Sequence, residues 1–95
     1  MDLLQLKESL AGYQPPANAS VYITALWYDA KGNWQKAHEL IQDISGKDAA
    51  WIHAYLHRKE GDAGNAGYWY SKAGKKPAAC TLQEEWEQIA AALLQ

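Results

Sequence analysis

A short pattern of small residues occurs twice in this chain and constrains its fold more than any other feature. Each copy begins with a glycine and a short polar residue, has an alanine five positions after the glycine, and has apolar residues at positions nine and twelve. The copies are Gly32-Asn33 with Ala37, Ile41 and Ile44, and Gly61-Asp62 with Ala66, Tyr70 and Ala73. The two glycines stand 29 residues apart, which favours repeated helical hairpins that stack on one another.

The rest of the chain also predicts helices. Apolar residues recur at helical spacing in successive segments, and no stretch alternates between apolar and polar residues as a half-buried strand does. We therefore predict a single all-α domain of about six helices, with two stacked antiparallel helical hairpins and an extra helix at each end. Its predicted parts are an N-terminal capping helix and proline loop (1–17), hairpin 1 (18–46), hairpin 2 (47–77) and a C-terminal capping helix (78–95).

Small residues in the repeat suggest how closely its helices pack. We expect Ala37 and Ala66 to be buried, because a larger side chain at either position would push neighbouring helix axes apart. Gly64 and Gly67 weaken the fifth helix by about 1 kcal/mol each relative to alanine. We expect these two glycines to let a neighbouring backbone come close.

The last predicted helix has an apolar face and an acidic face. Thr81 and Glu84 have the spacing of a capping box, which marks the start of this helix. Glu85 and Glu87 join Glu84 in a set that we expect to be exposed near the positive end of the helix dipole. Its predicted apolar face consists of Leu82, Trp86, Ile89 and Leu93.

Over about residues 18–77 the chain resembles tetratricopeptide-type repeats and the related Sel1-like repeats in a divergent form. In these families a helix ends near a Gly-Asp or Gly-Asn turn, and the next helix leads to a small alanine. The matching positions here are Gly32, Asn33, Ala37 and Ile41, then Gly61, Asp62, Ala66 and Tyr70. The period of 29 departs from the usual 34, and there are two units. Residues 50–70 also resemble a group of small uncharacterised bacterial helical proteins.

The resemblance implies a concave groove that binds a protein or peptide. Trp51, Tyr55 and Arg58 share one helix face, and these residue types dominate binding hot spots. The alternative is that Trp51 and Tyr55 fill the core. We therefore predict a non-catalytic helical-repeat module for an unidentified protein or peptide. Its predicted partner-binding residues are Tyr22, Leu26, Trp51, Tyr55, Arg58 and Lys59.

Three histidines offer an alternative function. His53 and His57 are four positions apart and share a helix face, a spacing that can hold a metal ion. His38 can join them only through folding. The metalloprotease arrangement, with a glutamate between two histidines, is missing, and no cysteine lies nearby. We expect histidines packed between helices, with no metal and no cofactor; a small-molecule or metal-dependent site on His38, His53 and His57 is the alternative.

A third interpretation is a self-associating structural unit. Tyr68, Trp69 and Tyr70 point in three successive helical directions, so they cannot all enter one core. We expect Tyr68 or Trp69 near the surface, where the two residues could form a homodimer contact.

Several other classes of protein are disfavoured. The chain has no nucleophile elbow, phosphate loop or dinucleotide-binding motif, so we predict no enzyme activity and no catalytic residues. A net charge of −2 with mixed signs argues against nucleic-acid and electrostatic membrane binding. No apolar run approaches the roughly 20 residues of a membrane span, and the start of the chain lacks a secretory signal. With Cys80 as its single cysteine, we expect a cytoplasmic protein.

Overall fold

The computed structural model describes residues 1–94 and is all-helical. No strand occurs among these residues, which confirms the predicted fold class. No helix in this part of the chain combines the length and apolar character that crossing a membrane requires. The helices are α1 (Leu3–Ser9), α2 (Val21–Ala30), α3 (Trp34–Ile41), α4 (Lys47–Lys59), α5 (Ala63–Ala73) and α6 (Leu82–Leu93), which confirms the predicted number of six.

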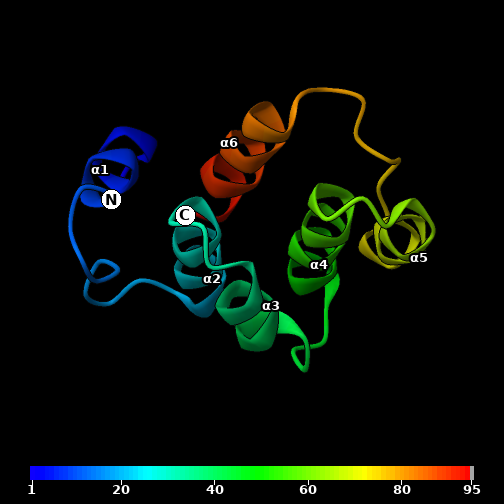
Figure 1. The fold of residues 1–95 in the computed structure, drawn as a ribbon, viewed down its shortest axis with the longest axis horizontal. Helices are drawn as coiled ribbons and strands as arrows, with labels where there is room; N and C mark the ends of the chain where they lie inside the picture. Colours follow the sequence, from blue (N-terminus) through cyan, green and yellow to red (C-terminus); the bar gives the residue numbers. More distant parts are fainter. Residues whose placement is uncertain (95) are drawn as a thin grey trace.

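The four central helices form two hairpins. Helix α2 packs along α3 and α4 along α5, and α3 in turn contacts α4 (Figure 1). Ala37 and Ala66 are both buried, as predicted. Ala37 belongs to the main core, whereas Ala66 packs with Ala54 and Tyr70 in a second cluster between α4 and α5. The small alanines therefore lie inside the two hairpins, where close helix packing needs them.

The repeated Gly-polar pair forms the turn inside each hairpin. Gly32 and Gly61 have φ angles of +86° and +89°, a left-handed backbone conformation that residues other than glycine rarely adopt. The next residues, Asn33 and Asp62, each accept a hydrogen bond from a backbone amide of the first turn of α3 or α5. Thr81 forms the predicted capping box at the start of α6.

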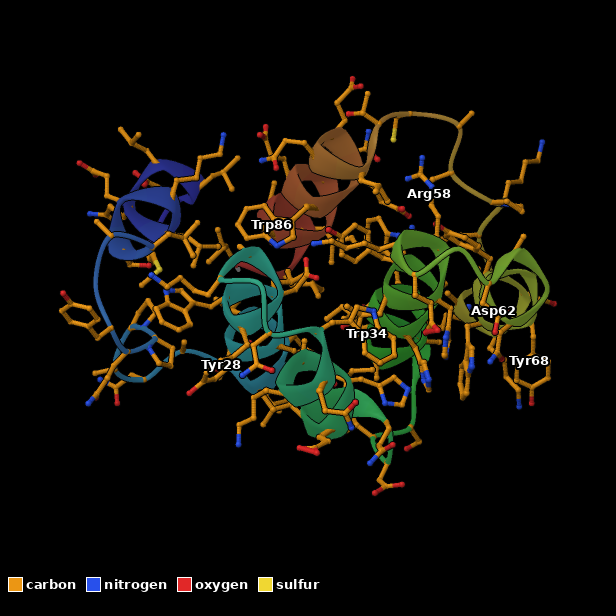
Figure 2. All side chains as sticks on the ribbon, viewed as in Figure 1. Tyr28, Trp34, Arg58, Asp62, Tyr68 and Trp86 are labelled. Atoms are coloured by element: carbon orange, nitrogen blue, oxygen red, sulfur yellow. The ribbon has the colours of Figure 1, made fainter. Side chains whose placement is uncertain are left out.

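Helix α6 lies over both hairpins, and α1 packs against α6. Helix α6 contacts α2 and α4, which are the first helices of the two hairpins. We expected it to continue the stack at one end as a C-terminal cap, and it does not (Figure 1). Its Trp86 side chain is 3% exposed, and the indole Nε1 donates to the Leu26 carbonyl at 3.0 Å. Figure 2 shows this ring between α6 and α2. The main core therefore includes side chains of α1, α2, α3, α4 and α6.

Gly64 and Gly67 do not admit a neighbouring backbone, so that prediction is wrong. A Cβ atom built at either position meets no heavy atom within 4 Å. Their backbones are helical, within α5. The two glycines therefore cost helix stability without any packing benefit that the structure shows.

Alanine at these positions should stabilise the domain. We expect Gly67→Ala to raise the free energy of unfolding by about 1 kcal/mol, and Gly64→Ala, in the first turn of α5, by less. Gly61→Ala is the matched control and should lower stability, because its φ of +89° strains any other residue. Urea denaturation of the three variants measures these changes; a loss of stability in Gly67→Ala would contradict the expectation.

Candidate functional site

The predicted partner groove is largely filled by α6. Leu26 and Tyr55 are 0% and 2% exposed and belong to the main core. Burial and the neighbouring Asp29 carboxylate raise the pKa of the Tyr55 hydroxyl well above its usual value, and this hydroxyl donates to Asp29 at 2.9 Å. Leu26 and Tyr55 are therefore core residues rather than groove residues. For Tyr55, this is the alternative that the sequence left open.

The two basic residues of the predicted groove bind buried carboxylates of the same chain. The Arg58 guanidinium donates to Glu85 at 2.9 Å and also to the Cys80 carbonyl. Lys59 donates to Asp29 at 3.0 Å. Asp29 and Glu85 are each 1% exposed. Arg58 thus links α4 to α6, and Lys59 links α4 to α2 (Figure 2 shows Arg58 beside the chain that leads into α6).

Glu85 is the residue that sequence reasoning misplaced. We expected it to be exposed, but its carboxylate also accepts hydrogen bonds from the Tyr70 hydroxyl at 2.6 and 2.8 Å and from the Trp51 indole at 3.3 Å. Burial and these bonds to Glu85 raise the pKa of the Tyr70 hydroxyl. The burial of Glu85 could have been predicted from its spacing, because Glu85 shares the helical stripe of the apolar residues Leu82 and Ile89.

Part of the predicted groove stays open beside the C-terminal end of α6. A hollow of about 640 Å³ lies there, with the partly exposed rings of Tyr22 and Trp51 in its wall. The Lys75 ammonium lies 4.0 Å from the centre of the Trp51 ring. Within residues 1–94, neither Lys75 nor Lys47 forms an ion pair. The hollow is lined by Ser20, Tyr22, Lys47, Asp48, Trp51, Ala73, Lys75, Ala92 and Leu93.

Folding brings the three histidines together between the hairpins. His38 comes from α3, and His53 and His57 come from α4. The Nε2 atoms of His38 and His53 are 3.0 Å apart. Each of the three residues offers one ring nitrogen, and these nitrogens all lie within 4.8 Å of one another. The juxtaposition that the alternative function required is therefore present. We call these three residues the histidine cluster.

Aromatic rings and a carboxylate fix the orientation of the histidine cluster. The Trp34 ring stacks on His38 with centroids 4.9 Å apart, and Trp69 stacks on His53 at 3.9 Å. Figure 2 shows Trp34 between α3 and α4, and its indole donates to the Leu56 carbonyl at 2.8 Å. On the third histidine, His57, Nδ1 lies 3.0 Å from a carboxylate oxygen of Glu60.

The surroundings of the cluster keep His38 and His53 in the neutral form. Burial, helped by the neighbouring His38 and His57, lowers the pKa of His53 to about 4. Burial also lowers the pKa of His38. At neutral pH the two imidazoles are therefore uncharged, and one Nε2–H can donate to the other Nε2. Neutral imidazole is also the form that binds metal ions.

The proposed self-association residues differ in exposure. Tyr68 is 55% exposed and points away from the helices (Figure 2). Trp69 is half-buried and in contact with His53. Tyr68 therefore offers the larger free aromatic surface, and a homodimer through Tyr68 and Trp69 stays a prediction.

Comparison of the chain with known protein families, with curated proteins and with solved structures found no match. The resemblance to tetratricopeptide-type and Sel1-like repeats therefore stays a prediction.

Proposed function

We propose that this domain is a non-catalytic module that binds an acidic peptide segment of another protein in the open hollow beside α6. The observation that carries the proposal is the pairing of two aromatic rings, Tyr22 and Trp51, with two lysines, Lys47 and Lys75, around one cavity. This site is smaller than the groove predicted from the sequence. Leu26 and Tyr55 lie in the core, and Arg58 and Lys59 pair with carboxylates of the same chain.

The chemistry of the hollow suits a ligand with carboxylates beside apolar groups. Tyr22 and Trp51 offer large rigid surfaces of the kind that dominate binding hot spots. Lys47 and Lys75 add positive charge that no carboxylate of residues 1–94 pairs with. The volume of about 640 Å³ is within the usual range of ligand pockets, roughly 300–1,000 Å³. The free thiol of Cys80 fits the cytoplasmic location that we include in the proposal.

Selection from a random peptide display library tests this proposal. We expect the enriched peptides to combine Asp or Glu with apolar residues, and to bind less tightly as salt is raised. In NMR titrations the indole N–H signal of Trp51 should shift, while that of Trp34, which lies between α3 and α4, should stay in place. Charge reversal at both lysines, Lys47→Glu with Lys75→Glu, should weaken binding at least about tenfold, or about 1.4 kcal/mol.

Lys76→Glu is the matched control, because Lys76 is exposed next to Lys75 and does not line the hollow. Its binding should equal that of the unmodified protein. A selection that enriches no acidic peptides would reject the proposal. So would peptides that bind the Lys47→Glu, Lys75→Glu variant as tightly as the unmodified domain.

A further inference from the structure

We propose that His38, His53 and His57 together bind one divalent transition-metal ion, with Zn²⁺ the best fit. The site does not depend on the proposed peptide hollow. His53 follows Trp51 by two positions, about 200° around helix α4, so the histidines and the hollow lie on opposite sides of that helix. This inference departs from the sequence prediction that no metal is bound.

The distances in the histidine cluster suit a small ion. In a tetrahedral zinc site with Zn–N bonds of 2.0–2.1 Å, neighbouring ligand nitrogens are roughly 3.4 Å apart. The Nε2 atoms of His38 and His53 are 3.0 Å apart, and a nitrogen of His57 lies within 4.8 Å of both. Small rotations of the rings would therefore place three nitrogens at bonding distance from one ion.

The ring orientations are already held in a way that favours a metal. Stacking of Trp34 on His38 and of Trp69 on His53 restricts both rings, so that little side-chain entropy is lost on binding. The contact between His57 Nδ1 and Glu60 favours a proton on Nδ1, which leaves Nε2 with a free lone pair. A carboxylate behind a histidine ligand is the usual support in zinc sites, where it fixes the tautomer and strengthens the ligand.

The ligand set selects the class of metal. Three imidazole nitrogens suit Zn²⁺, Cu²⁺ and Ni²⁺, whereas Mg²⁺ and Ca²⁺ require oxygen ligands. Three protein ligands leave a fourth position for water or a small anion. Because His38 belongs to hairpin 1 and the other two histidines to hairpin 2, the ion would also link the hairpins. We therefore expect Zn²⁺ to raise the midpoint of thermal unfolding.

Metal titration of the full chain, purified without a histidine tag and treated with EDTA, tests the site. Calorimetry with Zn²⁺ should give one ion per chain, and Co²⁺ should give the visible absorption of a tetrahedral nitrogen site. His38→Gln and His53→Gln should each weaken Zn²⁺ binding at least about tenfold. Glu60→Gln should weaken it by roughly ten- to a hundredfold while leaving the Co²⁺ spectrum tetrahedral, because Glu60 orients His57 without touching the ion.

His38→Gln is the decisive variant, since His38 is only half-buried and its replacement leaves the core closed. Circular dichroism confirms its helices before titration. Glu39→Gln is the control, because this exposed neighbour lies outside the cluster and should bind Zn²⁺ normally. Absence of Zn²⁺ binding, unchanged binding in His38→Gln, or displacement of Zn²⁺ by equimolar Mg²⁺ would each overturn the proposal.

Discussion

Replacing Glu85 by alanine is expected to lower the free energy of unfolding by about 3–5 kcal/mol, because it leaves the buried Tyr70 hydroxyl and the half-buried donors of Arg58 and Trp51 without their partner. The carboxylate, 1% exposed, accepts hydrogen bonds from Arg58, Tyr70 and Trp51. All three donors belong to hairpin 2, so the change also removes the polar contacts that hold α6 onto α4. Urea denaturation followed by circular dichroism measures the loss.

Glu87→Ala is the matched control on the same helix. Glu87 pairs with Lys7 at the surface, where an ion pair contributes little, so stability should change only slightly. Glu85→Gln keeps the shape of the side chain and removes its charge, and it should fall between the other two variants. If Glu85→Ala were as stable as Glu87→Ala, water would have to replace the carboxylate at Arg58 and Tyr70. That result would contradict the claim that the hydrogen bonds of Glu85 stabilise the fold.

Trp86→Ala is the second change with a large expected effect. Removal of this 3% exposed ring leaves a cavity at the contact of α6 with α2, and large-to-small changes of this kind cost about 3–5 kcal/mol. Domains of this size have a total stability of about 5–15 kcal/mol, so the variant should lose a large share of its stability. The shift in the urea midpoint gives the measurement.

Trp86→Phe separates the ring from its hydrogen bond. Phenylalanine retains most of the apolar surface but loses the bond to the Leu26 carbonyl, so we expect it to recover more than half of the lost stability. In the Trp86→Phe variant, backbone amides of α6 should be less protected from hydrogen exchange than those of α4, because α6 is attached to the hairpins mainly through Trp86 and Glu85. Equal protection of the two helices would indicate that they unfold as one unit and contradict this division.

The chain itself fills most of the groove between the hairpins, through Trp86 and Glu85 of α6. A domain of this length buries only about 60–65% of its unfolded surface, so two hairpins alone would leave much apolar surface exposed. Helix α6 covers that surface through Trp86 and Ile89, while Glu85 satisfies Arg58 and Tyr70. Beside its C-terminal end, α6 leaves the hollow at Tyr22 and Trp51 uncovered.

The helices and the turns that separate them follow from short-range patterns in the sequence. The Gly32-Asn33 and Gly61-Asp62 pairs indicate turns because a left-handed glycine and a capping side chain act within a few residues. The burial of Ala37 could likewise be predicted, since helical spacing places it on the apolar face. These features depend on neighbours three or four positions apart, which the sequence displays directly.

The position of α6 and the contacts among polar residues come from the packing of whole helices. Spacing places Glu85 on the helical stripe of Leu82 and Ile89, but the donors that it meets in α4 and α5 depend on how α6 is placed against hairpin 2. The histidine cluster has the same origin: His53 and His57 share a face of α4 by spacing, but His38 joins them because α3 packs against α4. Contacts between helices come from the fit of whole faces, and that fit exists only once the chain has folded.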